Sequence, residues 1–239
     1  MKIYSVEAII IKRRNFLEKD RVLTLFSREK GKIEVLAKGA RRPGSRLSFH
    51  SDLGINGMFR VHRGRTLDIL TEVTPIFLPK DAVGQVFKTE KISFAFKLIN
   101  KLYELNQAHK KSYEVLKKTI RDVSENDFQL TFLIFLISII CDLGLMPELG
   151  RCFECNRKFE KGEKIVFSPK GGLAHCSCFD SEDNSIGEDE IKLLRLISKT
   201  PPQKIFNSKV KTDIFEKTFL HIKSYLEWHF GKILPEKVL

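Results

Sequence analysis

The chain has 239 residues, of which 42% are hydrophobic, and its formal net charge is +12. This hydrophobic content excludes an intrinsically disordered chain and indicates a folded core spread over one to three domains. The longest apolar stretch, residues 132–141, is too short for a membrane span, which needs about 18 residues or more. The first residues, with Glu7 inside the first apolar run, do not resemble a signal peptide, and this predicts a cytoplasmic protein.

The positive charge is concentrated at the start of the chain. Residues 1–80 contain 17 Lys and Arg against 8 Asp and Glu, a net of +9, whereas residues 81–239 contain 25 against 22, a net of +3. A basic field of this kind usually serves a polyanion such as nucleic acid. Solubility alone is the alternative explanation.

Five short strands are expected within residues 1–79. They fall at 3–12, 21–27, 32–38, 53–62 and 66–74, with turn signals such as Lys30-Gly31 and Pro43-Gly44 between them. Five strands with a longer connection between the third and the fourth suit a small closed barrel. We predict an OB-type barrel, with an SH3-like barrel as the alternative.

The cations of this segment lie at strand ends and in loops, where they are candidates for DNA binding. The candidates are Lys12, Arg13, Arg14, Lys38, Arg41, Arg42, Arg46, Arg63 and Arg65. The aromatic residues Phe16, Phe49 and Phe59 are interleaved with them, and single-stranded nucleic acid needs both charge and stacking surface. Phe59 also fits a core position. The loop 38–46 is the first choice, because four cations in nine residues repel one another unless an anion offsets them.

After Pro75 and Pro79 the chain is predicted to be helical, at residues 81–105, 111–123, 128–143, 188–198 and 212–230. Residues 128–143 are apolar on nearly every face and predict a buried core helix. The fold class is therefore α+β and multidomain, with an OB-type β-barrel followed by an all-α domain that carries an inserted zinc-binding module. We predict an OB-fold nucleic-acid-binding domain at 1–79, a helical domain at 80–147 and 181–239, and the zinc module at 148–180.

Four of the five cysteines lie in a window of 27 residues that predicts a structural zinc site. Cys152 and Cys155 form a C-x2-C pair, and the second arm offers His175, Cys176 and Cys178 after a Gly-Gly turn. Spacing favours His175 as the third ligand, because His175-x2-Cys178 repeats the two-residue gap. Ligand softness favours Cys176. Both alternatives stay open at this point.

Catalytic motifs are missing from the sequence. It contains no Walker loop, no G-x-G-x-x-G, no G-x-S-x-G, and no H-x-E or H-E-x-x-H signature. A zinc ion with four protein ligands has no open position for a reacting water. The sequence therefore predicts a binding protein and not an enzyme.

Several motifs resemble the bacterial recombination mediator family RecO. The N-terminal ones are AIIIKRR from Ala8, EKDRVLTL from Glu18 and AKGARRPGSRL from Ala37; the later ones are DLGLMP from Asp142, the C-x2-C pair, and FSPKGG from Phe167. The match runs in order from residue 3 to about residue 180. Residues after it resemble the family only as helix.

This resemblance implies binding of single- and double-stranded DNA, annealing of complementary strands, and partnership with RecR in loading RecA. RecF in some lineages and the acidic tail of single-strand binding protein are further implied partners. Lys38, Arg41, Arg42 and Arg46 match the basic loop of the family's OB domain, and Cys152, Cys155 and Cys178 match its zinc ligands. The family pattern G-G-x-x-C-x-x-C puts a cysteine where His175 stands, so this chain departs from it there.

A protein of another class explains the same features differently. It would be a zinc-stabilised scaffold whose basic barrel docks the acidic tail of a protein partner. Oligonucleotide binding at low salt distinguishes the two hypotheses.

Overall fold

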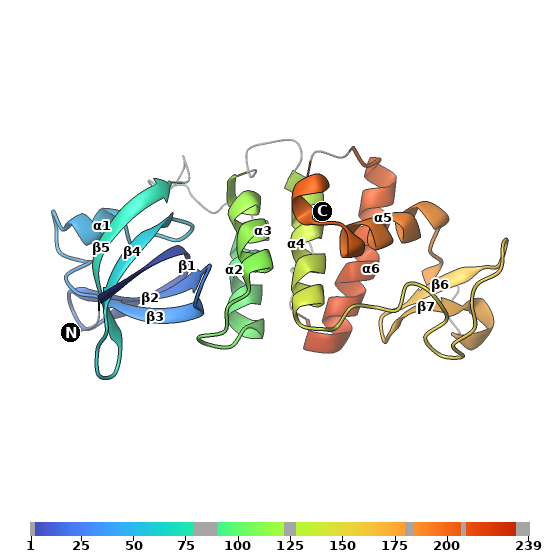
Figure 1. The fold of residues 1–239 in the computed structure, drawn as a ribbon, viewed down its shortest axis with the longest axis horizontal. Helices are drawn as coiled ribbons and strands as arrows, with labels where there is room; N and C mark the ends of the chain where they lie inside the picture. Colours follow the sequence, from blue (N-terminus) through green and yellow to red (C-terminus); the bar gives the residue numbers. More distant parts are fainter. Residues whose placement is uncertain (1–2, 79–89, 122–127, 180–183, 207–208, 233–239) are drawn as a thin grey trace. The chain divides into compact units, whose positions relative to one another are not determined.

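A computed structural model of the chain describes residues 3–78, 90–121, 128–179, 184–206 and 209–232 (Figure 1). The chain divides into two compact units, Met1–Val123 and Ser124–Leu239. Each unit has its own core. The finer division into four segments stays a prediction, and the predicted helix start at residue 81 lies outside the described residues.

The first unit begins with a closed barrel of five strands in the order β1-β2-β3-β5-β4. The strands are β1 (Ile3–Phe16), β2 (Asp20–Ser27), β3 (Gly31–Ala37), β4 (Asn56–His62) and β5 (Asp68–Phe77). A one-turn helix, α1 (Arg46–Phe49), lies in the connection between β3 and β4. The barrel closes through a short parallel pairing of β3 with β5, at Val35 with Asp68 and Leu36 with Ile69. This confirms the predicted five-stranded OB-type barrel.

The part of β1 from Ala8 to Ile11 is buried on both faces, which explains why its sequence is a continuous apolar run rather than an alternating one. Ala8 and Ile10 point into the barrel core. Ile9, between them, is also fully buried and pairs with Phe26 of β2. The ring of Phe26 packs at 5.5 Å from that of Tyr103 and at 6.2 Å from that of Tyr113, which cover this outer face.

Two helices pack on the barrel and belong to the same unit, α2 (Glu90–Leu102) and α3 (Lys110–Arg121). Gly31 of β3 lies very close to the chain that connects α2 to α3. Its φ is +68°, and a Cβ added there would lie 1.6 Å from the carbonyl oxygen of Gln107. Only glycine fits this position, because a side chain would meet both an unfavourable backbone conformation and the neighbouring backbone.

A buried polar network joins α3 to the barrel. Asn56 Nδ2 donates to the carbonyl oxygen of Ala8 at 3.1 Å and to the Tyr113 hydroxyl at 2.8 Å. Lys117 Nζ donates to Glu7 at 2.5 Å beside them. Because each buried bond would cost free energy if one partner were removed, this network specifies how α3 lies against β1 and β4.

The second unit is built around α4 (Phe128–Asp142), with α5 (Glu188–Lys199) and α6 (Thr212–Phe230) packed on it. Residues 130–140 are all buried, as predicted for a helix that is apolar on nearly every face. Phe132 of α4 packs against Phe219 of α6, with ring centroids 6.2 Å apart. The predicted span of α6, 212–230, agrees with the structure.

A two-stranded hairpin, β6 (Ile165–Ser168) and β7 (Gly172–His175), forms part of the cysteine-rich segment. The sequence analysis predicted its turn but not its strands. Phe167 of β6 packs at 5.1 Å from His221 of α6, which fastens the hairpin to the helical core. Gly172, with φ +116°, lets the backbone of Glu148 come close, since an added Cβ would lie 2.4 Å from the Glu148 carbonyl oxygen.

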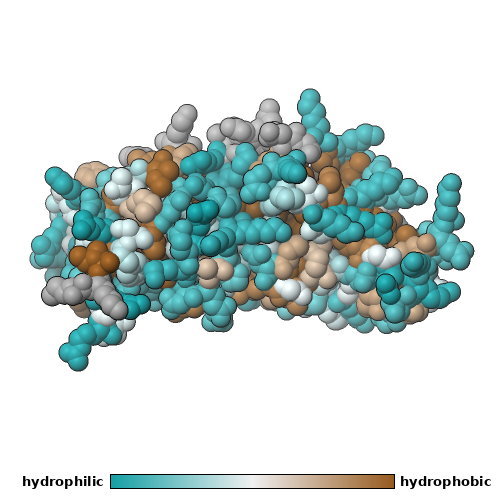
Figure 2. Space-filling model, viewed as in Figure 1, coloured by the Kyte–Doolittle hydropathy of each residue, from teal (hydrophilic) through white to brown (hydrophobic). Residues whose placement is uncertain are grey.

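None of the described helices combines the length and apolar character that crossing a membrane requires. Hydrophilic side chains cover most of the face drawn in Figure 2.

Candidate metal centre and candidate nucleic-acid interface

The first arm of the cysteine cluster is a tight turn. Asn156 N donates to Cys152 O at 2.9 Å, and Cys152 N donates to Arg157 O at 2.9 Å. Asn156 adopts a positive φ of 61°, a conformation that asparagine tolerates better than most residues. The turn therefore aims the thiols of Cys152 and Cys155 at the same point.

The second arm comes from the end of the hairpin. His175 is the last residue of β7, and Cys178 ends a short 3-10 helix, Cys176–Cys178, that follows directly. The potential ligand atoms of Cys152, Cys155, His175 and Cys178 all lie within 4.8 Å of one another. A tetrahedral zinc ion with Zn–S bonds of about 2.3 Å places its ligand atoms roughly 3.8 Å apart, so this donor set can hold such an ion.

Among the described residues, the cluster includes His175 and does not include Cys176. Cys155 Sγ lies 3.4 Å from His175 Nδ1. The half-buried Cys176 packs instead against the small apolar core of the module, formed by Cys152, Val166 and Ala174. The two-residue spacing was the better guide to the geometry.

Neighbouring groups tune the cluster. Glu163 Oε2 lies 3.2 Å from His175 Nε2, the ring nitrogen that does not face Cys155. A hydrogen bond from the Arg157 side chain is the largest cause that lowers the pKa of the Cys155 thiol, to about 6. Because thiolate is the metal-binding form of cysteine, the lowered pKa favours cation binding at Cys155, whereas hydrogen bonding with Cys155 raises the pKa of the Cys178 thiol.

All nine predicted DNA-binding cations are exposed on the first unit. Seven of them lie near one end of the barrel, three in the last part of β1 and four in the loop 38–46. Backbone bonds hold that loop against the β1–β2 turn: Arg41 N donates to Lys19 O at 2.9 Å, and Gly39 N donates to Asp20 Oδ1 at 2.7 Å. These hydrogen bonds therefore give the loop a defined position against the barrel.

A cluster of arginines around one carboxylate was not predicted as such. Arg13 and Arg21 both make ion pairs with Asp52, and Arg21 also donates to Ser51 Oγ at 2.6 Å. Burial, and then the charges of Arg13 and Arg41, lower the pKa of Arg21. Two guanidinium groups thus share the carboxylate of Asp52, and the charge of Arg41 acts on Arg21 as well, which leaves a local excess of positive charge. Arg21, the second residue of β2, was not among the cations predicted from the sequence.

Arg63 and Arg65 lie elsewhere on the barrel, in the β4–β5 turn. His62, which precedes them, pairs with Ile3 at the beginning of β1. The β1–β2 turn follows Phe16, at the other end of the same strand. The predicted cations thus form two groups, one near each end of β1.

The three interleaved aromatic residues have different environments. Phe59 is fully buried in the barrel core, as its alternative interpretation predicted. Phe16 is half-buried with the Arg14 guanidinium 5.8 Å from its ring centre. Phe49, on α1, is 72% exposed and is the ring most available for stacking.

A basic barrel joined to a helical unit with a Cys3His cluster defines a two-unit protein with a potential metal site and a potential polyanion surface. The family model described as Recombination protein O N terminal matches residues 1–78, and Recombination protein O C terminal matches residues 88–237. The chain therefore belongs to the RecO family of DNA repair and recombination proteins.

Curated relatives agree with this assignment. The chain is similar to a DNA repair protein RecO from Desulfitobacterium hafniense (strain DSM 10664 / DCB-2), with 30% identity over 189 residues, which cover 77% of this chain and 67% of that one. It is also similar to a DNA repair protein RecO from Bacillus cereus (strain AH187), with 28% identity over 237 residues, covering 98% of this chain and 94% of the relative.

Proposed function

We propose that this protein is a non-enzymatic recombination mediator that binds single- and double-stranded DNA through the first unit and anneals complementary strands. In this role it works with RecR to load RecA, and RecF and the acidic tail of single-strand binding protein are further partners. Its place of action is the cytoplasm, at the nucleoid. The observation that carries the proposal is the pairing of Arg13 and Arg21 with one carboxylate, that of Asp52, close to the exposed cations of the loop 38–46.

Local charge supports a phosphate ligand for this cluster. Asp52 offsets one of the two guanidinium charges that it pairs with, so one remains for an external anion. The exposed cations of the loop 38–46 extend the same surface, and the exposed ring of Phe49 adds a stacking partner. Cations beside an accessible aromatic ring are the combination that single-stranded nucleic acid needs.

The experiment is a salt titration of oligonucleotide binding. Each phosphate neutralised on single-stranded DNA contributes about −0.7 to the slope of log affinity against log salt concentration. Replacing Arg41 and Arg42 by Ala should flatten the slope by roughly one to two units and weaken binding to all sequences alike, because phosphate contacts carry no base information. Lys217→Ala with Lys223→Ala, two cations of α6, removes the same charge and should leave binding unchanged. An unchanged slope in the Arg41/Arg42 variant would contradict the proposal.

Annealing should require neither ATP nor magnesium, since the sequence has no phosphate-cradling loop. The protein should accelerate duplex formation between complementary oligonucleotides in a buffer that contains a chelator and no nucleotide. A strict requirement for ATP would contradict this mechanism.

Zinc is proposed as a structural ion held by Cys152, Cys155, His175 and Cys178. When bound, it cross-links the turn of the first arm to the end of the hairpin. The module's own core is small, with three buried residues, so a cross-link of this kind stabilises its fold. Cys152→Ser should reduce zinc content and soluble yield together, and protein purified without chelator should contain stoichiometric zinc.

The second candidate function is a scaffold in which the loop 38–46 docks an acidic partner tail. The same exposed cations favour it. In that case the Arg41/Arg42 variant would lose affinity for an acidic peptide while its DNA affinity and salt slope stayed unchanged.

A further inference from the structure

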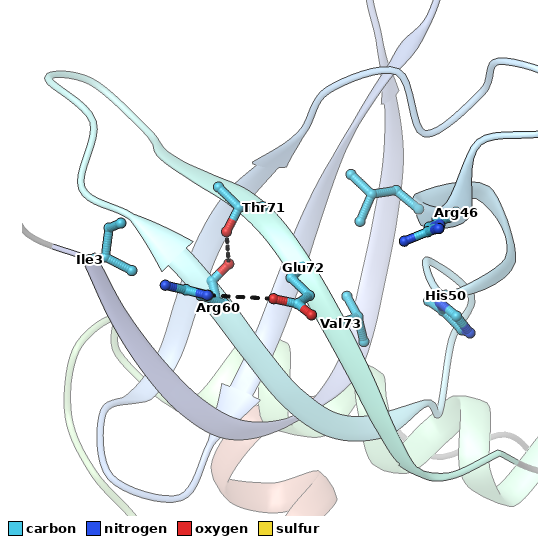
Figure 3. A pocket seen from close by; sticks show the side chains of 8 residues that line it. Ile3, Arg46, His50, Arg60, Thr71, Glu72 and Val73 are labelled. Carbon is cyan, nitrogen blue, oxygen red and sulfur yellow. Dashed lines mark hydrogen bonds and ion pairs between the residues drawn. The ribbon is translucent and has the colours of Figure 1, made fainter.

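A groove of about 460 Å³ lies on the barrel between α1 and residues of β1, β4 and β5 (Figure 3). This volume falls within the range of about 300–1,000 Å³ that small-ligand pockets occupy. Arg46 and His50 face it from the side of α1, and Arg60 and Glu72 face it from the strands. No function described so far uses this groove.

The groove lies between the two groups of predicted cations. Arg46, the last cation of the loop 38–46, lines one side of it. Ile3, which lines the other side, pairs with His62 immediately before the β4–β5 turn that carries Arg63. A strand of DNA that contacts both groups therefore passes this groove.

The lining combines apolar surface with a donor and an acceptor. Ile3, Leu47 and Val73 supply the apolar part. Arg60 and Glu72, 3.7 Å apart and both more than half exposed, present a guanidinium next to a carboxylate. A carboxylate repels a phosphate or an acidic peptide, but it accepts a hydrogen bond from the exocyclic amino group of a base. A nucleobase matches this lining in having flat apolar faces and an edge with both donors and acceptors.

We propose that the groove takes one unpaired base of a DNA strand bound to the barrel, with its faces against Ile3, Leu47 and Val73 and its edge toward Arg60 and Glu72. Arg46 and His50 then lie at the groove's rim, where the phosphate of that nucleotide passes. The proposal rests on DNA binding by the first unit. A base within a duplex cannot enter, so the groove favours single-stranded over double-stranded DNA.

A charge-neutral double variant tests this directly. Arg60→Ala with Glu72→Ala removes one positive and one negative charge, so it leaves the long-range attraction of phosphates unchanged. Affinity is measured for a single-stranded oligonucleotide and for an abasic strand of the same length. We expect the variant to bind the normal oligonucleotide about 3- to 10-fold more weakly, with the abasic strand and the salt slope unaffected, because the net contribution of a hydrogen bond at the base edge is of about this size.

The matched control is Lys192→Ala with Glu188→Ala, which removes another exposed pair of one cation and one carboxylate, 3.3 Å apart on α5 and outside the groove. It should bind both strands as the unaltered protein does. If the Arg60/Glu72 variant also binds both strands as the unaltered protein does, the groove does not hold a base, although DNA binding by the first unit stands. If the unaltered protein binds no DNA, the proposed function and the groove assignment fall together.

Two competitors separate other occupants from a base within a strand. An excess of free deoxynucleoside monophosphates should not displace the oligonucleotide, because a free nucleotide lacks the phosphate contacts of the loop. Displacement at micromolar concentration would overturn the proposal in favour of a free-nucleotide site. An acidic peptide that loses affinity for the Arg60/Glu72 variant would overturn it in favour of a protein partner.

Discussion

Glu163 lies 3.2 Å from Nε2 of His175, while Nδ1 of the same ring lies 3.4 Å from the Cys155 sulfur. A proton on Nε2 that is donated to the carboxylate leaves the Nδ1 lone pair directed into the cysteine cluster. Such outer partners fix the tautomer and the ring orientation of metal-binding histidines.

The first prediction is that Glu163→Gln weakens zinc binding about 10- to 100-fold, because a neutral amide oxygen replaces the charged carboxylate that orients the imidazole. Competition with a chromophoric chelator measures the affinity. Glu160→Gln, an exposed acid of the same turn, is the control and should bind zinc normally. Equal affinity in the two variants would show that Glu163 does not position the histidine.

The second prediction concerns the third ligand. His175→Ala should lose stoichiometric zinc, whereas Cys176→Ala should retain it, since the Cys176 side chain packs into the module's core and is not part of the cluster. Elemental analysis of the purified variants gives the zinc content. Retention in His175→Ala with loss in Cys176→Ala would reverse the assignment and restore the all-cysteine set.

These two residues also show what spacing can and cannot predict. The C-x2-C pair and the second arm identified a metal site because metal ligands within one turn need short, defined separations. Glu163 was not identified, because a lone acid twelve residues before its partner has no spacing signature. Only the hairpin, which brings the chain back on itself, places the two side chains together.

The barrel follows the same rule. Its strands could be predicted from alternation and turn residues, and α6 from a regular apolar face with a glycine stop. Arg21 was missed because its partners Ser51 and Asp52 lie 30 residues or more away in the sequence. The packing of α2 and α3 on the barrel could not be predicted either, because an apolar helix face does not identify the surface on which it packs.

The third prediction compares two glycines that share a positive φ. Gly31→Ala should destabilise the first unit severely, since its Cβ would lie 1.6 Å from the Gln107 carbonyl oxygen. A Cβ added at Gly44, which has φ +73°, would meet no such atom within 4 Å. Gly44→Ala should cost about 1–2 kcal/mol from the backbone conformation alone. Urea unfolding of both variants measures the difference, and similar losses would mean that the close approach at Gly31 relaxes at little cost.

The fourth prediction is a pH dependence that arises from Glu7. Burial by itself raises the pKa of Glu7, but the hydrogen bond and charge of Lys117, together with hydrogen bonds from Tyr113 and Asn56, outweigh it, and the pKa lies below its ordinary value. A lowered carboxyl pKa contributes stability above the ordinary pKa of about 4.3, and this contribution is lost as the pH falls through the folded-state pKa. Lys117→Met should therefore lower the free energy of unfolding at pH 7 and have a smaller effect near pH 3.

Lys110→Met, at the beginning of the same helix, is the control. Its effect on the free energy of unfolding should be the same at pH 7 and near pH 3. The free energy of unfolding of each variant is measured by urea titration at several pH values. A Lys117→Met deficit that stays constant between pH 7 and pH 3 would mean that Lys117 stabilises the unit by packing and not by its charge.

The fifth prediction concerns Asp52, the acid that pairs with both Arg13 and Arg21. Its carboxylate competes with phosphate for the same guanidinium groups. Asp52→Asn removes one negative charge from the cluster while keeping an oxygen that can accept hydrogen bonds. DNA affinity should therefore rise, and the salt slope should steepen by up to about 0.7, the contribution of one further neutralised phosphate on a single strand.

Glu29→Gln, which removes an exposed acid elsewhere on the barrel, controls for the change in net charge. Both variants gain one unit of net charge, so a general electrostatic effect would raise their affinities equally at low salt. A larger gain for Asp52→Asn, together with a steeper slope, assigns the effect to the arginine cluster. A loss of affinity in Asp52→Asn would mean the opposite relationship, in which the carboxylate orients the arginines for the phosphate and its removal lets them move apart.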